Sequence, residues 1–164
     1  MNTTLDVFTD GEYDVNRLKE IYEINQDNVP DVGTLDSISK LKELISISSY
    51  HSILLLDNNV IGFSICFREG TSYWSENYKY FITHLKKFLY VDRIAIDQNY
   101  RRKGLGQKMY KDIFLNAEQD ELTITAEVNT KPINQPSLNF HTTMGFKQIG
   151  KREFLDHNVA YFIK

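Results

Sequence analysis

The sequence predicts an α+β fold in which helices cover the faces of one mixed sheet. Its 164 residues are near the usual size of a single domain, and 41% hydrophobic with 25% charged residues is an ordinary globular composition. Strand-like and helix-like stretches follow one another in the order βααββ(α)βαβαββ, which is not a run of βα repeats. We therefore expect a single domain over residues 1–164.

The first half of the chain predicts a strand, two helices and a hairpin. Residues 5–8 are strand-like, and apolar residues then recur at helical spacing over residues 15–22 and again over residues 38–48. Two further strand-like stretches, residues 51–56 and 60–67, are separated by Asp-Asn-Asn. These residue types tolerate the positive φ angles of tight turns, so we expect the two stretches to form a hairpin.

The second half of the chain alternates more regularly between the two kinds of element. It predicts, in order, a short helix within residues 73–87, a strand at 88–96, a helix from 105 to 117, a strand at 122–128, a short helix ending near 145 and strands at 146–154 and 159–163. The helix from 105 to 117 has one broad apolar stripe, which indicates that it packs on the sheet.

Composition argues against several classes of protein. A formal net charge of −3 does not suit a general nucleic-acid binder, which needs a broad basic surface. Cys66 is the only cysteine, so neither an internal disulfide nor a paired-cysteine metal site can form, and we expect no metal. The longest apolar runs, such as residues 53–56, are too short to cross a bilayer, and the N-terminus lacks a signal-peptide pattern. We expect a cytoplasmic protein with a small partner, without nucleic-acid or membrane partners.

The segment that follows the predicted strand 88–96 suits a pyrophosphate group. There Arg101-Arg-Lys-Gly-Leu-Gly106 leads directly into a helix. Backbone N–H groups in a glycine-containing loop, together with the positive end of a helix dipole, bind anions. Two glycines before a helix can also simply make a turn. A Rossmann fingerprint would need a small residue at Met109, and the P-loop sequence Gly-Lys-Ser/Thr is absent.

Two motifs place this segment in a wider context. Arg101-Arg-Lys-Gly-Leu-Gly106 resembles the Arg/Gln-x-x-Gly-x-Gly/Ala signature of the GNAT superfamily of N-acetyltransferases. Asn134-x-x-Ser137-x-x-Phe140-His141-x-x-x-Gly145-Phe146 is similar to the second motif of that superfamily. The likeness covers nearly the whole chain. The chain also resembles a subgroup of bacterial predicted acetyltransferases whose substrates are unassigned. The residues that carry this narrower resemblance are Tyr90-Val-Asp-Arg-Ile94, Asn77-Tyr78 and Glu127-Val-Asn129.

The resemblance implies both a fold and a cosubstrate. The fold would be a GNAT-like acyl-CoA N-acyltransferase fold, with a central twisted, mostly antiparallel sheet of about six to seven strands flanked by helices. The cosubstrate would be acetyl-CoA, whose pantetheine arm pairs with a strand that splays from its neighbour. The residues implied to bind CoA are Ile94, Ala95, Ile96, Arg101, Arg102, Lys103, Gly104, Leu105, Gly106, Gln107, Asn134 and Ser137.

Direct acetyl transfer also needs a group that removes a proton from the amine. A lysine-like amine has a pKa of about 10.4, so it is charged near neutral pH. Asp92 alternates with Tyr90, Ile94 and Ile96, so we expect it on their mainly apolar face, where desolvation would raise its pKa. A structural salt bridge is the alternative reading of Asp92. Glu127 would reach the splay from the adjoining strand, and we favour it as the base, although it could also be an exposed strand residue.

The leaving thiolate of CoA needs only a weak acid, because a thiol has a pKa of about 8.5. Many members of the superfamily use a tyrosine for this step, and His141 occupies that position here. Either an imidazolium at His141 donates the proton, or a tyrosine elsewhere, such as Tyr90, has taken over the role. His141 can also be purely structural.

These residues predict an N-acetyltransferase that moves an acetyl group from acetyl-CoA directly to a primary amine of a small molecule or a peptide. The alternative is a catalytically inactive acetyl-CoA-binding sensor or interaction module, which the departure from the usual tyrosine at His141 would suit. Fold and cosubstrate do not identify the acceptor. A homodimer is compatible with the sequence, and the preferred acyl chain stays open.

Overall fold

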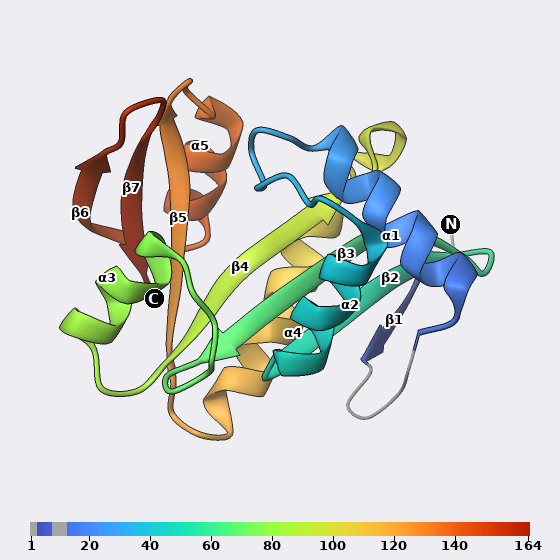
Figure 1. Cartoon of the computed structure of the whole chain (residues 1–164), viewed down its shortest axis with the longest axis horizontal. Helices are drawn as coiled ribbons and strands as arrows, with labels where there is room; N and C mark the ends of the chain where they lie inside the picture. Colours follow the sequence, from blue (N-terminus) through green and yellow to red (C-terminus); the bar gives the residue numbers. More distant parts are fainter. Residues whose placement is uncertain (1–2, 8–12) are drawn as a thin grey trace.

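One seven-stranded sheet runs through the part of the chain that the structure, a computed structural model, describes, namely residues 3–7 and 13–164. Its strands are β1 (Thr3–Val7), β2 (Tyr50–Leu56), β3 (Asn59–Arg68), β4 (Phe88–Ile96), β5 (Thr123–Lys131), β6 (Lys147–Glu153) and β7 (Asn158–Ile163). The strand order is β1-β2-β3-β4-β5-β7-β6, in which β4 and β5 are parallel and all other neighbours are antiparallel (Figure 1). The predicted α+β fold with a mostly antiparallel sheet is confirmed.

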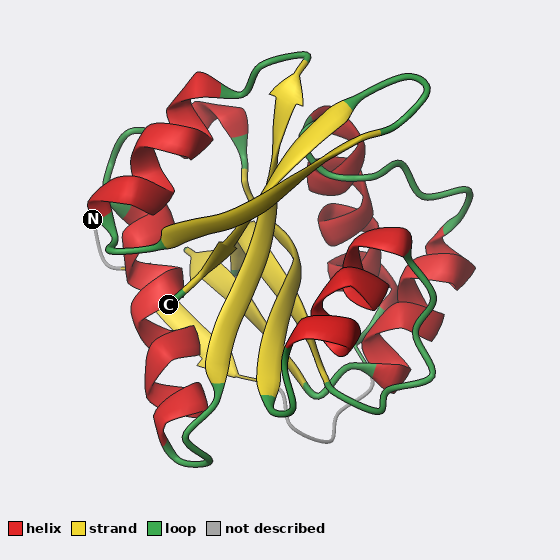
Figure 2. Cartoon of the chain, turned by 90° about the vertical axis from the view of Figure 1, so that its left-hand side faces the viewer, coloured by secondary structure: helices red, strands yellow, loops and turns green. Residues whose placement is uncertain are grey.

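Helices pack on both faces of the sheet (Figure 2). They are α1 (Val15–Asp27), α2 (Ile38–Ile47), α3 (Glu76–His84), α4 (Leu105–Glu118) and α5 (Gln135–Thr143), with a short 3-10 helix at Gln98–Tyr100. Apolar residues of α1, α2 and α3 join one core cluster, whereas those of α4 and α5 join a second cluster on the opposite face. No helix among residues 13–164 is both long enough and apolar enough to span a membrane.

The observed elements agree closely with the predicted ones. Strand β4 begins and ends at the predicted residues, and α4 begins at Leu105 as expected. The predicted hairpin is formed by β2 and β3, and Asp57 and Asn58 in its turn adopt φ angles of 49° and 68°. Of the first predicted strand, Phe8 lies outside the described residues.

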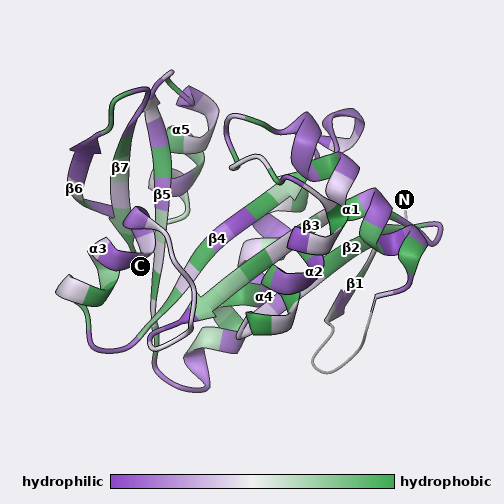
Figure 3. Ribbon diagram, viewed as in Figure 1, coloured by the Kyte–Doolittle hydropathy of each residue, from purple (hydrophilic) through white to green (hydrophobic). Residues whose placement is uncertain are grey.

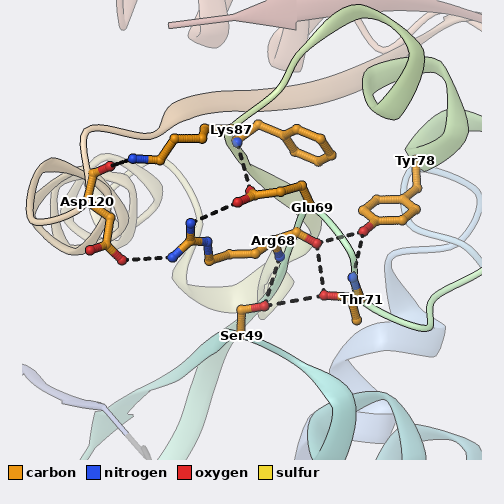
Figure 4. Close-up of polar contacts among 8 residues, drawn as sticks. Ser49, Arg68, Glu69, Thr71, Tyr78, Lys87 and Asp120 are labelled. Atoms are coloured by element: carbon orange, nitrogen blue, oxygen red, sulfur yellow. Dashed lines mark hydrogen bonds and ion pairs between the residues drawn. The ribbon is translucent and has the colours of Figure 1, made fainter.

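Polar contacts fasten one end of the sheet, where β4 and β5 begin (Figure 4). Arg68, at the end of β3, forms ion pairs with Glu69 at 2.8 Å and with Asp120 at 2.9 Å. Lys87 Nζ donates to the Asp120 carbonyl oxygen at 2.7 Å, and the Phe88 N–H donates to Glu69 at 3.0 Å. Single exposed ion pairs contribute about 0–1 kcal/mol, but this network joins β3, β4 and the turn before β5.

At the other end, β4 and β5 separate. Their parallel pairing covers only Phe88–Tyr90 and Thr123–Thr125, although both strands continue for several residues. Just beyond this pairing, β3 pairs with Val91 and then with Arg93, so Asp92 is the extra residue of a β-bulge. A bulge bends its strand and increases its twist, which directs β4 away from β5. The splay implied by the family resemblance is therefore present.

The bulge corrects one expectation about Asp92. Its alternation with Tyr90, Ile94 and Ile96 predicted that the four side chains share one face, and this is wrong. Tyr90 belongs to the core cluster beneath α1, α2 and α3, whereas Ile94 and Ile96 pack against the clusters on the α4 side. One extra residue in β4 reverses the alternation, so even-numbered side chains change face at Asp92.

The outer strand β6 is the hydrophilic edge of the sheet. Nearly all of its residues are exposed, and Figure 3 shows the strand mostly in purple. Its sequence contains two lysines, one arginine and one glutamate among seven residues. Charged side chains on an edge strand disfavour pairing with another chain, so β6 is a protected edge.

Candidate functional site

Two cavities meet where β4 and β5 separate. The first has a volume of about 590 Å³ and lies on the side of α4 and α5. The second has a volume of about 400 Å³ and lies under the loop that joins α1 to α2. Asp31, Val32, Asp92 and Glu127 line both cavities. The gap between the two strands is therefore the place where molecules in the two cavities would come together.

The first cavity is lined by the glycine-containing loop at the start of α4. Gly104 has a φ of 73° and no side-chain hydrogen bond caps the helix. A Cβ at Gly104 would meet nothing within 4 Å, so the loop is open to a ligand. The first-turn N–H groups of a helix carry partial positive charge, and Arg101 and Arg102 add their charges to the same wall. The arrangement suits a pyrophosphate.

Most residues expected to bind a cofactor line this first cavity. Those residues are Ile94, Ala95, Ile96, Arg101, Arg102, Gly104, Leu105, Gly106, Gln107, Asn134 and Ser137. Lys103 is not among the lining residues, and its Nζ atom lies over the Tyr100 ring, 5.2 Å from the ring centroid. Asn134 also caps α5, because its side chain accepts a hydrogen bond from the Ser137 N–H.

Glu127 lies where the two cavities meet, and only one of its two carboxylate oxygens is hydrogen-bonded. Its Oε1 atom accepts hydrogen bonds from the Tyr90 hydroxyl at 2.8 Å and from Asn77 Nδ2 at 3.3 Å. Its Oε2 atom is buried and has no hydrogen-bond partner among the described residues. Burial, reinforced by the nearby charge of Asp92, raises the pKa of Glu127 to about 8. Such a carboxylate can accept a proton near neutral pH.

Asp92 is held much more tightly than Glu127. Its Oδ1 atom accepts from the Tyr73 hydroxyl at 2.6 Å, and its Oδ2 atom pairs with Arg93 Nε at 3.1 Å. Both side chains of this ion pair are buried. Burial raises the pKa of Asp92, while the Arg93 charge opposes that shift. The salt bridge that was the alternative reading of Asp92 is present in the structure.

Arg93 links this pair to the loop above the second cavity. Besides Asp92, it donates to Asn25 Oδ1 at 2.8 Å and to the Gly33 carbonyl oxygen. On the far side, Asn129 Nδ2 of β5 donates to the Pro30 carbonyl oxygen at 3.0 Å. The loop between α1 and α2 is thus fastened to both separating strands.

His141 is buried and paired with a tyrosine that the sequence did not indicate. Its Nδ1 atom lies 2.8 Å from the Ser137 carbonyl oxygen, which can only accept, so Nδ1 carries the hydrogen. Nε2 then accepts from the Tyr110 hydroxyl at 2.7 Å. Burial lowers the pKa of His141, which favours the neutral imidazole. This geometry does not favour an imidazolium at His141.

Tyr110 is the tyrosine that lines the first cavity. The hydroxyl of Tyr90, the tyrosine that the sequence suggested, instead contacts Glu127, and Tyr90 lines only the second cavity. In the sequence Tyr110 is simply one of the aromatic residues flanking the apolar stripe of α4. Its role depends on the packing of α4 against α5, for which the linear pattern contains no signal.

Many polar residues line the second cavity, beside apolar ones such as Val32 and Pro132. Its wall includes the hydroxyl or amide groups of Tyr73, Ser75, Asn77 and Asn129 and the carboxyl groups of Asp31, Asp92, Glu127 and Asp156. Residues 29–34 of the loop between α1 and α2 also contribute to this lining.

Comparisons with known proteins identify the family and the fold. The model of the Acetyltransferase (GNAT) family matches residues 18–146. A search of curated proteins finds no match. The ribosomal-protein-S18-alanine N-acetyltransferase of Escherichia coli superimposes with a TM-score of 0.71 at 15% identity, covering 99% of this chain and 92% of that one.

Two further solved structures are similar at comparable levels. An N-acetyltransferase from Staphylococcus aureus Mu50 has a TM-score of 0.70 at 15% identity, covering 100% of this chain and 98% of that one. Arabidopsis thaliana NAA60 in complex with acetyl-CoA has a TM-score of 0.75 at 10% identity, covering 99% and 98%. At these identities the likeness concerns the fold.

The raised pKa of Glu127 predicts a stability that depends on pH. The native state keeps a proton on Glu127 between pH 4.5 and about 8, where the unfolded chain has lost it. The free energy of unfolding should therefore fall as pH rises through this window, by up to about 1.4 kcal/mol per pH unit. Glu127→Gln should remove this part of the slope, as measured by urea unfolding between pH 5 and 8. Glu153→Gln on exposed β6 is the control, and equal slopes for Glu127→Gln and the wild type would contradict the assignment.

Proposed function

We propose that this chain, which belongs to the acetyltransferase (GNAT) family, transfers an acetyl group from acetyl-CoA directly to a primary amine of a small molecule or a peptide. The observation that carries this proposal is the meeting of two cavities at Glu127, in the gap between β4 and β5. Donor and acceptor can then occupy opposite sides of one gap, which direct transfer requires.

The first cavity suits acetyl-CoA. The uncapped start of α4, with Arg101 and Arg102 beside it, would hold the pyrophosphate. Beyond Tyr90, the edge of β4 that faces β5 is not paired with it, so backbone groups on this edge near Ile94 are available for the amide groups of the pantetheine arm. The Ile96 carbonyl oxygen already accepts a hydrogen bond from Arg101 Nε at 3.4 Å. When bound, acetyl-CoA supplies the acetyl group as a thioester, whose carbonyl carbon the amine attacks.

Glu127 would act as the general base on the acceptor side. The amine enters the second cavity as an ammonium ion, and the free Oε2 atom of Glu127 removes one proton from its nitrogen. Tyr90 and Asn77 keep the carboxylate oriented through Oε1. Asp92 stays paired with Arg93 and acts indirectly, because its charge helps to raise the pKa of Glu127.

On the donor side, Tyr110 would stabilise the leaving thiolate. Its hydroxyl can turn from His141 Nε2 to donate a hydrogen bond to the departing sulfur. Full proton transfer is unnecessary, since a thiol has a pKa of about 8.5 and the thiolate can leave as such. Burial raises the pKa of Tyr110, which keeps its hydroxyl protonated. His141 holds the Tyr110 hydroxyl before the reaction and does not itself supply a proton.

Acetyl-CoA should stabilise the fold against heat more than NAD or ATP does, because only acetyl-CoA combines pyrophosphate with a pantetheine arm.

Gly104→Asp should weaken acetyl-CoA binding about ten-fold or more, since a carboxylate enters the anion-binding loop. Gly70→Asp is the matched control, because Gly70 has a φ of 79° and also has nothing within 4 Å of an added Cβ, but lies outside both cavities. Equal affinities of the two variants, measured by calorimetry, would refute this role of the loop.

Turnover of acetyl-CoA against a panel of small amines and peptides tests the activity itself. With any active amine at saturation, kcat should rise with pH through a midpoint near pH 8 and level off above it, as Glu127 loses its proton. Asp92→Asn should move the midpoint to lower pH, because it removes a charge that raises the pKa of Glu127. An unmoved midpoint would argue against Glu127 as the base.

Tight binding of acetyl-CoA without turnover of any amine would favour the inactive acetyl-CoA-binding module.

Tyr110→Phe should lower kcat about ten-fold or more with little change in acetyl-CoA affinity, because the lost hydrogen bond matters mainly in the transition state. His141→Phe should lower kcat less, because it removes only the hydrogen bond that holds the Tyr110 hydroxyl before the reaction, and the double variant should be little worse than Tyr110→Phe, since His141 acts through that hydroxyl. Additive losses would contradict this coupling. A wild-type kcat that falls as pH rises above 6 would instead support an imidazolium donor.

A further inference from the structure

Two successive hydrogen bonds connect strand β7 with the proposed general base. The Tyr161 hydroxyl donates to Asn77 Oδ1 at 2.9 Å, and Asn77 Nδ2 donates to Glu127 Oε1 at 3.3 Å. From this geometry we infer that Tyr161 is a positioning residue, which orients the Asn77 amide so that Oε1, and not Oε2, is the oxygen of Glu127 that is held. The inference rests on the proposed function, because it concerns the base of the same site.

The register of the sheet places Tyr161 beside Glu127. The two residues are direct partners in the antiparallel pairing of β5 with β7, so their side chains lie on the same face. Tyr161 is fully buried and lines neither cavity. Burial raises the pKa of its hydroxyl to about 12, so this group keeps the hydrogen that it donates to Asn77. Tyr161 therefore acts on Glu127 through Asn77 and not on a substrate.

The Asn77 amide has a donor end and an acceptor end, and both have a partner. An ionised carboxylate only accepts hydrogen bonds, so Glu127 in its active form needs the NH2 end of the amide. Asn77 is only half-buried and lines the second cavity, where an unheld amide would turn toward solvent. The hydrogen bond from Tyr161 holds the Oδ1 end, which keeps the NH2 end directed at Glu127.

Helix α3 carries Asn77, and the two outer strands fix this helix. The Tyr80 ring of α3 stacks on the Tyr161 ring, with the ring centroids 3.8 Å apart and the planes inclined by 10°. Gly150 of β6 lies opposite Tyr161, and a Cβ there would overlap the Tyr80 hydroxyl. The missing side chain at Gly150 lets Tyr80 lie flat against Tyr161. The outer strands thus set the position from which Asn77 reaches the base.

Tyr161→Phe tests the inference, because it removes only the hydroxyl. The hydrogen bond from Asn77 lowers the pKa of Glu127, so weakening it should raise that pKa by about half a pH unit. Carbon-13 NMR follows the titration of the Glu127 carboxyl, whose signal is assigned by its loss in Glu127→Gln. Asn77→Leu should raise the pKa at least as much, and adding Tyr161→Phe to Asn77→Leu should raise it no further.

Tyr78→Phe is the matched control. The Tyr78 hydroxyl also belongs to α3, but it donates to the Arg68 carbonyl oxygen at 2.6 Å. Its loss should destabilise the same helix and leave the pKa of Glu127 unchanged. The other ionisable groups whose charges act on Glu127 or respond to it in this part of the site are unchanged in every variant, namely Tyr73, Tyr90 and Asp92.

Turnover gives a second measurement. With an active amine at saturation, kcat of Tyr161→Phe should be about three-fold below the wild type at pH 7 and close to it at about pH 10, because only the protonation of Glu127 differs. A kcat lowered equally at both pH values would overturn the inference. So would an unchanged pKa of Glu127 in Tyr161→Phe, or an equal rise in Tyr78→Phe. A raised pKa without turnover of any amine would contradict the proposed function but support the positioning of Glu127 by Tyr161.

Discussion

The site depends on how early the parallel pairing of β4 with β5 ends. Only Phe88–Tyr90 and Thr123–Thr125 are paired, and past them the two strands separate. The ion pairs around Arg68 hold the paired end (Figure 4), whereas the bulge at Asp92 bends β4 at the other end. The separation leaves backbone groups of β4 without a strand partner and lets side chains from both faces of the sheet meet. Both cavities follow from this one interruption.

The same interruption brings two buried carboxyl groups together and gives them different roles. Arg93 neutralises Asp92 at 3.1 Å, so that this carboxylate can stay charged. Within the described part of the chain, Glu127 has hydroxyl and amide partners but no cation among its hydrogen-bond partners, and its pKa rises to about 8. Neighbouring carboxyl groups that are held in different environments are typical of acid–base sites. The arginine that stabilises one carboxyl also fastens the loop over the second cavity, which couples the charge pattern to the shape of the acceptor side.

Features that depend on residues close together in the sequence could be predicted, whereas features that depend on contacts between distant segments could not. Strand β4, the glycine loop and the start of α4 are specified by local patterns, and the residues predicted for the first cavity line it, with the exception of Lys103. The face of Ile94 was predicted wrongly, because the bulge depends on the register of β3 against β4. The hydrogen bond between Tyr110 and His141 joins residues 31 positions apart on two helices, so no local pattern contains it.

The central claim is that donor and acceptor meet at Glu127 from opposite sides of the gap between β4 and β5. A crystal structure with CoA joined through an acetyl linker to the nitrogen of a primary amine that the enzyme uses tests it most directly. We expect the CoA part along the start of α4, the amine part in the second cavity and the linked nitrogen within hydrogen-bond reach of Glu127 Oε2. Both parts bound on one side of the gap, or a linker remote from Glu127, would contradict it.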